Sequence, residues 1–259
     1  GVTNGVAFTP NATNTYIVTG SDANGCSKTS SILITVNPLP AVGATATPSA
    51  TICTGTSVTL SGTGASSYIW NNGVTNGVSF TFTSTNTYVV TGTDANGCTN
   101  TSSIVITVNP LPIVTANAMP SSSICAGTSI TLYGTGASSY IWNNGVTNGV
   151  SFTPTSTNTY VVTGTDANGC TNTTSILITV NANPNPIITG GTVFNGSGTL
   201  HAGNYSSYLW STGASTSTIT INTTDTYSVI VTDANGCTGT ASQYDIVNAQ
   251  FISSSNSSE

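Results

Sequence analysis

The side chains of this sequence that could do chemistry are its cysteines, which fall into two classes by their neighbours. Four follow the turn signature Asp-Ala-Asn-Gly, and two lie in an Ile-Cys-x-Gly-Thr segment. Zinc binding is a weak interpretation, because no two cysteines are close in sequence and the single histidine, His201, has no neighbouring ligand. Repeated cysteines in an acidic chain with β-strand patterns favour disulfides and an oxidising compartment. The first class comprises Cys26, Cys98, Cys170 and Cys237, and the second comprises Cys53 and Cys125.

The aspartate of the turn signature is the second candidate for chemistry, as a calcium ligand. Ca²⁺ binds about six to eight oxygen atoms, usually from several carboxylates, whereas each full repeat has only this one acid. An aspartate that accepts hydrogen bonds within its own turn is the preferred interpretation. The same scarcity argues against paired catalytic carboxylates, and without a positioned base, nucleophile or metal we predict no enzyme activity and no cofactor. The turn residues singled out are Asp94, Asn96, Gly97, Asp166, Asn168 and Gly169.

The sequence repeats at a fixed step, so the elements that position these residues recur as modules. The block GVTNGV begins at Gly1, Gly73 and Gly145, a period of 72 residues without insertion or deletion. Such a period is typical of an array of modules that provides length, stiffness or multivalency rather than one active site. Prolines in VNPLP and VNANPNP predict short, semi-rigid joints. The predicted divisions are a partial module at 1–37 with the C-terminal strands only, modules at 38–109 and 110–181, a divergent module at 182–248, and a polar tail at 249–259.

Every periodic segment of residues 38–109 predicts a β-strand. Apolar and polar patterns mark strands at 42–47, 57–62, 68–70, 78–82, 87–93 and 101–108, with a turn about every 8 to 12 residues. This pattern predicts an all-β fold, a tandem array of Ig-like β-sandwich modules. Aromatic residues recur where such a sandwich keeps its core tryptophan and its tyrosine corner, although an aromatic binding platform is the alternative. They are Trp70, Trp142, Trp210, Tyr88, Tyr160 and Tyr227.

Charged residues are scarce: they make up 3% of the chain, which has one lysine, no arginine and a net charge of −6. The shortage of cations argues against nucleic-acid binding, because Lys and Arg are needed to neutralise phosphates. No apolar run approaches the roughly 18 residues of a membrane-spanning helix. A hydrophobic share of 37%, gathered in β-branched and aromatic clusters, favours a folded chain over a disordered one. Because GVTNGV is the middle of a repeat, we expect a piece of a longer protein with no secretory signal at its start.

Three motifs carry a resemblance to a known family. The segments ICxGTSxTL, YIWNNG and TNTYVVTGTDANGC, with the Thr/Ser-rich strand that follows, resemble the Ig-like and PKD-like repeats of giant surface adhesins of gliding Bacteroidota. The resemblance covers residues 1 to about 240 and implies an extracellular, cell-surface location with export by type IX secretion. The last module departs from the pattern, since it keeps the turn cysteine Cys237 but lacks the Cys-x-Gly segment.

Strand order favours disulfides between modules over disulfides within one. In an Ig-like sandwich, the corner after the first strand and the turn before the last strand lie at opposite poles, about 20 Å apart. A disulfide requires Cα atoms about 4.4 to 6.8 Å apart. In a head-to-tail array the corner of one module faces the turn of the next. This arrangement predicts the pairs Cys53–Cys170 and Cys125–Cys237.

The first two turn cysteines have no corner cysteine in a preceding module of this sequence. Cys26 and Cys98 are therefore predicted to bond to upstream modules that the sequence does not include. Two alternatives stay open, namely free thiols and disulfides inside a module, which would join Cys53 to Cys98 and Cys125 to Cys170.

The leading hypothesis is a structural one: an extracellular stalk or filament segment of a cell-surface adhesin, stiffened by proline-rich joints and disulfides. Its partners would be further copies of the module in the parent chain or filament. The alternative is an array of weak carbohydrate- or surface-binding modules made multivalent by repetition, with surface glycans as partners. Tyr133, which stands where the preceding repeat has Ser61, and Tyr205 are the main aromatic candidates for that alternative.

Overall fold

The computed structural model describes residues 1–191 and 196–247, and its regular elements in those ranges are all β-strands. The all-β prediction is confirmed. Two compact units make up the chain, Gly1–Leu111 and Pro112–Glu259. The polar tail predicted at 249–259 lies outside the described residues, as do residues 192–195 and 248 of the module predicted at 182–248.

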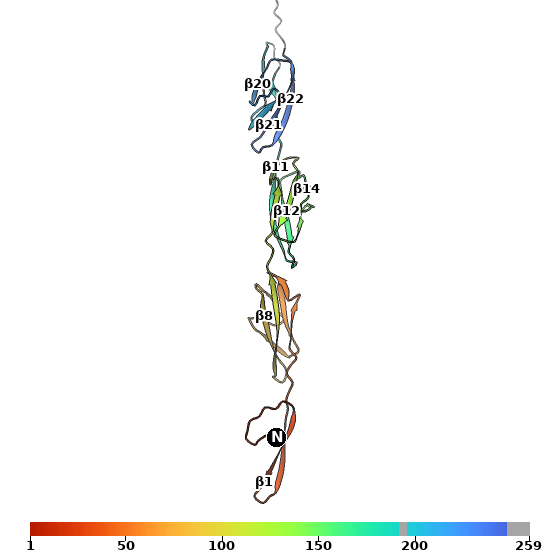
Figure 1. Ribbon diagram of the computed structural model, residues 1–259, viewed down its shortest axis with the longest axis vertical. Helices are drawn as coiled ribbons and strands as arrows, with labels where there is room; N and C mark the ends of the chain where they lie inside the picture. The colour runs from red at the N-terminus through yellow and green to blue at the C-terminus, as the bar shows by residue number, and fades with distance from the viewer. Residues whose placement is uncertain (192–195, 248–259) are drawn as a thin grey trace, which may run out of the picture. The chain divides into compact units, whose positions relative to one another are not determined.

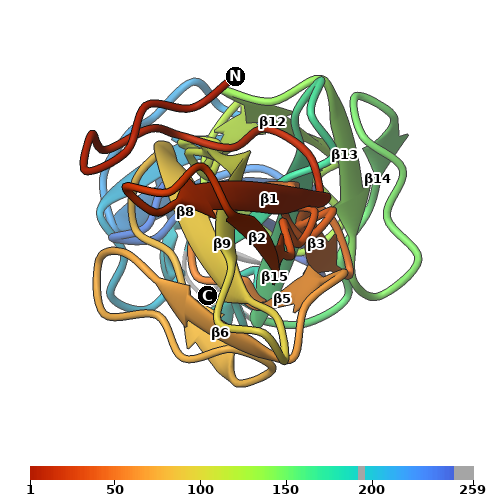
Figure 2. The ribbon, with the colours of Figure 1, turned by 90° about the horizontal axis from the view of Figure 1, so that it is seen from below.

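The first unit opens with an antiparallel hairpin. Strands β1 (Asn14–Ser21) and β2 (Ser27–Ile34) pair along their whole length and lie side by side (Figure 1, Figure 2). Their connection is the Asp-Ala-Asn-Gly-Cys turn, in which Gly25 has the left-handed φ of 83°. Residues 1–13 contain no strand, and Phe8 packs edge-on against Tyr16 with ring centroids 5.1 Å apart.

Residues 43–109 of the same unit form a sandwich of two sheets. One sheet has the order β3-β5-β7 and the other β4-β9-β8-β6. Neighbouring strands are antiparallel except β4 and β9, which are parallel. This order is that of an Ig-like sandwich, as predicted. The strands are β3 (Gly43–Thr47), β4 (Thr51–Cys53), β5 (Ser57–Thr63), β6 (Ser67–Trp70), β7 (Ser79–Thr81), β8 (Asn86–Thr93) and β9 (Thr99–Asn109).

The second unit contains two further sandwiches. Strands β10 to β16 repeat the order of the first sandwich, and β17 to β22 form the three-stranded sheets β17-β18-β20 and β19-β21-β22. The former are β10 (Thr115–Met119), β11 (Ser123–Cys125), β12 (Ile130–Thr135), β13 (Ser139–Trp142), β14 (Ser151–Phe152), β15 (Asn158–Thr165) and β16 (Thr171–Asn181). The latter are β17 (Thr189–Gly190), β18 (Gly198–His201), β19 (Ser207–Trp210), β20 (Thr218–Ile221), β21 (Asp225–Thr232) and β22 (Thr238–Asp245).

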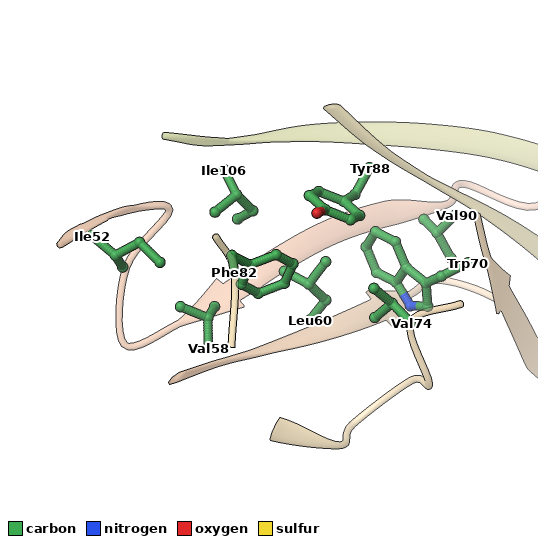
Figure 3. Packing of buried hydrophobic residues seen from close by; sticks show 9 residues of the cluster. All are labelled: Ile52, Val58, Leu60, Trp70, Val74, Phe82, Tyr88, Val90 and Ile106. Atoms are coloured by element: carbon green, nitrogen blue, oxygen red, sulfur yellow. The ribbon is translucent and has the colours of Figure 1, made fainter. Parts of the chain in front are cut away.

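Alternation along the strands separates core from surface. In β6, Trp70 is 6% exposed whereas its neighbour Ile69 is 75% exposed, because successive side chains of a strand point to opposite faces. Trp70 joins Leu60 of β5 and Tyr88 of β8 in the first core (Figure 3). The sandwiches of the second unit have cores of the same kind. All six aromatic residues predicted for the core are buried: Trp70, Trp142, Trp210, Tyr88, Tyr160 and Tyr227.

A polar contact inside the core, which the strand pattern does not reveal, holds the tryptophan. Asn148 lies in the GVTNGV block, and its Oδ1 accepts hydrogen bonds from Trp142 Nε1 at 3.0 Å and from the backbone N–H of Gly134 at 2.9 Å. Asn76 makes the equivalent pair of bonds in the preceding sandwich. The amide thus satisfies the single polar atom of the core tryptophan and a strand N–H in one place.

Replacing Asn148 with alanine should destabilise the β10–β16 sandwich by about 2 to 3 kcal/mol, because two part-buried donors lose their acceptor. Amide hydrogen exchange in β12 and β15 measures the free energy of unfolding of this sandwich. The matched control is Thr147→Ala, since Thr147 is exposed and its loss should cost less than about 0.5 kcal/mol. Equal exchange rates in the two variants would show that the Asn148 bonds do not stabilise the core.

Candidate functional site at the poles of the sandwiches

The corner cysteine of a sandwich lies beside the point where the chain leaves it. β11 pairs in parallel with the end of β16, which places Cys125 opposite Asn181. The backbone N–H of Ala126 donates to the Asn181 carbonyl at 2.8 Å, and the Asn181 side chain donates to the Ile124 carbonyl at 3.2 Å. We call this end, residues 123–126 with residue 181, the C-terminal pole. Cys53 has the same position in the β3–β9 sandwich, at the end of β4.

The turn cysteine lies at the opposite end, beside the point where the chain enters. In the β10–β16 sandwich Asn172, two residues after Cys170, donates from Nδ2 to the carbonyl of Pro112 at 3.0 Å. The β3–β9 sandwich has the equivalent bond. The last sandwich has Gly239 at this position and packs more closely, since a Cβ there would lie 1.9 Å from the Pro184 carbonyl oxygen. We call the turn and its linker proline the N-terminal pole.

A disulfide joins the C-terminal pole of the β10–β16 sandwich to the N-terminal pole of the β17–β22 sandwich. Cys125 and Cys237 are separated by 112 in sequence, yet their Cα atoms lie 5.4 Å apart. That distance falls in the range of about 4.4 to 6.8 Å that the bond requires. Asn183 of the linker adds a polar contact, because its Nδ2 donates to the carbonyl of Ala126 at 3.2 Å. Two covalent connections, the linker and the disulfide, therefore run between these poles.

The other four cysteines divide into bonded and free. Cys53 and Cys170 are also disulfide-bonded, whereas Cys26 and Cys98 are free thiols. Because Cys98 is free and Cys125 is bonded at the joint, neither of the disulfides considered inside a module is present. Bonds from the two free thiols to upstream modules stay a prediction.

The aspartate of each turn holds the cysteine in place through the backbone. Asp233 Oδ1 accepts hydrogen bonds from the N–H groups of Asn235 and Cys237, both at 2.8 Å, and Gly236 has the left-handed φ of 81° that closes the turn. The hydrogen bonding expected inside the turn thus includes the backbone N–H of the cysteine, a contact that the sequence did not predict. Equivalent bonds shape the turns of Asp94, Asn96 and Gly97 and of Asp166, Asn168 and Gly169.

Replacing Asp233 with alanine should destabilise the β17–β22 sandwich by about 1 to 2 kcal/mol, since two backbone donors lose a charged acceptor. The matched variant Asp233→Asn keeps an oxygen acceptor without the charge and should cost less than about 0.5 kcal/mol. The midpoint of urea unfolding compares the two at constant slope. A loss of the same size in both variants would assign the effect to the negative charge instead.

The remaining candidates from the sequence do not gather into a site. His201 Nδ1 lies 2.8 Å from Thr218 Oγ1 on the neighbouring strand β20. Tyr133 and Tyr205 are both half-buried, and the Tyr205 ring lies edge-on to Tyr208 with centroids 6.3 Å apart. Across residues 1–191 and 196–247, no three His, Cys, Asp or Glu side chains form a group that could hold a metal ion. The same ranges contain no helix long and apolar enough to cross a membrane.

Comparison with known proteins finds similar solved structures only. No protein-family model and no curated protein matches the chain. A Ca²⁺-stabilised adhesin that helps an Antarctic bacterium reach out and bind ice is 18% identical at a TM-score of 0.37, over 92% of this chain and 82% of that chain. A structure from a 1.5-MDa bacterial ice-binding adhesin is 16% identical at 0.33, over 83% and 100%. The immunoglobulin domains 1–5 of Sidekick-1 are 16% identical at 0.26, over 95% and 68%. At such TM-scores none of these likenesses indicates what this chain binds.

Proposed function

We propose that the chain is a segment of an extracellular stalk or filament of a cell-surface adhesin, in which Ig-like modules at 38–109, 110–181 and 182–248 follow one another. The observation that carries this proposal is the Cys125–Cys237 disulfide, which connects opposite poles of two successive sandwiches. Such a bond continues the covalent chain across the joint, in addition to the linker. We further propose that Cys53 and Cys170, both disulfide-bonded, make the same connection one module earlier.

A joint with two covalent connections bends less than a joint with a single linker. The linker of residues 182–186 contains Pro184 and Pro186, whose φ angles are fixed by their rings. The Pro184 carbonyl lies so close to Gly239 that any larger residue would collide with it. With the disulfide as a second tether, hinge motion at this joint is restrained from two points, and that restraint suits a stalk.

The chemistry of the surface fits an extracellular location. Disulfides persist in oxidising compartments outside the cytosol. A chain with one lysine and no arginine also presents almost no site to a protease of trypsin specificity. From the sequence resemblance, we propose that the parent protein is an adhesin of gliding Bacteroidota exported by type IX secretion. Its partners would be further copies of the module.

Small-angle X-ray scattering on the oxidised chain tests the stalk. Modules of about 30 to 40 Å in an extended series predict a maximum dimension of about 130 Å and a radius of gyration of about 35 to 40 Å. A compact chain of this length would have a radius of gyration of only about 18 Å. The Cys125→Ser/Cys237→Ser variant should broaden the distance distribution because the joint loses its second tether. A compact radius for the oxidised chain would refute the proposal.

One observation favours a second function, binding of carbohydrate. Tyr244 of β22 is largely exposed and offers a ring to a sugar face. The residues at the equivalent position of the other sandwiches are Val105 and Leu177, so the exposed aromatic ring is not repeated from module to module. Submillimolar binding on a glycan array, lost in Tyr244→Ala and kept in Ile246→Ala, would establish this function in place of the stalk. Absence of glycan binding would contradict this second function.

A further inference from the structure

The β1–β2 hairpin presents an apolar face that is covered in the two sandwiches with the same repeat. Val18 is 59% exposed, whereas Val90 and Val162, one and two repeats later, are 0% exposed. Ile32 is 61% exposed, and its counterpart Ile104 packs against the core of the β3–β9 sandwich. A hollow on the hairpin is lined by Phe8, Tyr16, Val18, Ile32 and Ile34, together with residues 2–6. The side chains of a sandwich core are present here without their opposite layer.

The strands themselves show where the missing layer belongs. β2 ends at Ile34, whereas β9 continues through residues 107–109, and those residues pair in parallel with β4. Likewise Ala7 to Thr9 form no strand, whereas their counterparts in β7 pair with β5. In the next sandwich, the strands that pair with the counterparts of both of these missing strand segments are formed by residues 51–63. The hairpin therefore lacks partners of the β4 and β5 type, in a defined register.

In the complete sandwich these partners fill the same space. Val58 and Leu60 of β5 face Tyr88 and Ile106 across the core (Figure 3). β6 pairs antiparallel with β8, so that Trp70 lies opposite Val90. On the hairpin, the residue in the position of Val90 is Val18, which is 59% exposed where Val90 is 0% exposed. Every covering element comes from the stretch of residues 38–72.

We propose that the face of the β1–β2 hairpin is a docking surface for a segment with the sequence pattern of residues 38–72, which completes a sandwich with it. A Thr-Ile-Cys strand would pair in parallel with residues 35–37, and a Ser-Tyr-Ile-Trp strand would pair antiparallel with residues 18–21. A second copy of the hairpin is a poorer occupant, because it could cover the apolar side chains but supplies neither a β4 nor a β5 strand. This inference concerns the hairpin alone and holds whether or not the array is a stalk.

The test adds the missing segment to the full chain. A copy of residues 38–72, with Cys53→Ala to avoid a new thiol, is fused directly before Gly1, as Asn72 precedes Gly73 in the chain. Amide exchange in β1 and β2 should slow by at least about 100-fold relative to the unfused chain. The matched control carries Val58→Asp and Leu60→Asp in the added copy only, and should give no protection. Exchange in β8 and β9 serves as the internal reference for a folded neighbour.

Three results would overturn the proposal. The first is no slowing of exchange in β1 and β2 with the intact copy, and the second is equal slowing with the control copy. The third is a dimer of the unfused chain, seen by analytical ultracentrifugation, that Val18→Asp abolishes and that protects β1 and β2 by itself. In that case the occupant of the surface is a second copy of the hairpin.

Discussion

The Trp142→Ala variant should lose about 3 to 5 kcal/mol of stability in the β10–β16 sandwich. Trp142 is 5% exposed and packs among Ile130, Leu132 and Tyr160, so its removal leaves a large cavity. It also takes one of the two donors from Asn148 Oδ1. A domain of this size is stable by only about 4 to 11 kcal/mol, so the change removes a large part of the total. Amide exchange in β12, β15 and β16 should accelerate strongly, while β8 and β21 should keep their protection.

The neighbouring residue supplies the control for this experiment. Ile141 precedes Trp142 on β13 and is 74% exposed, because it points to the other face of the sheet. Ile141→Ala should change the free energy of unfolding by less than about 0.5 kcal/mol. Comparable losses in the two variants would mean that β13 does not divide into a core face and a solvent face.

Removing the joint disulfide should have the other large effect. The bond joins residues separated by 112 in sequence, and a loop of that length lowers the entropy of the unfolded chain by the equivalent of about 4 to 5 kcal/mol. The Cys125→Ser/Cys237→Ser variant should lose stability of that order, summed over the β10–β16 and β17–β22 sandwiches. Calorimetry should show the unfolding transitions of both sandwiches at lower temperature, since both belong to the loop.

The free thiols provide the matched comparison. Cys26→Ser/Cys98→Ser also replaces two cysteines, but neither is bonded in the structure, so its transitions should move by less than about 4 °C. Reduction of the native protein would be a less specific test, because it also breaks the disulfides of Cys53 and Cys170. If the Cys125→Ser/Cys237→Ser variant unfolded at the same temperatures as the native protein, loop closure by this disulfide would not contribute to the stability of the two sandwiches.

Much of the fold could be predicted because alternation and turns are local signals. The strands expected at 57–62 and 87–93 are β5 and β8 to within one residue at each end. The position of Cys125 at one pole and Cys237 at the other follows from strand order alone, since each cysteine is adjacent in sequence to a corner or a turn. A long-range contact became predictable here because both of its ends are fixed by local structure.

What escaped prediction depends on contacts that no periodicity encodes. β4 has only the residues Thr51–Cys53, too few to show alternation, and its partner is the far end of β9. The bond from Asn148 to Trp142 passes across a turn, and an asparagine in a turn is usually explained by the turn itself. The reach of Asp233 to the cysteine N–H depends on the φ angles of the residues between them. Each of these features requires backbone coordinates rather than a pattern of residue types.

The disulfide between poles also changes which part of the chain can be pulled. Under tension applied at the two ends of the Pro112–Glu259 unit, the shortest covalent path runs to Cys125, crosses to Cys237 and continues from there. Residues 126–236 lie in a side loop off this path and cannot be extended by force while the bond is intact, whereas β10, β11 and β22 lie on the path and bear the load. For the same reason, a single cut anywhere in that loop would leave both fragments covalently attached until the sulfur bridge is reduced.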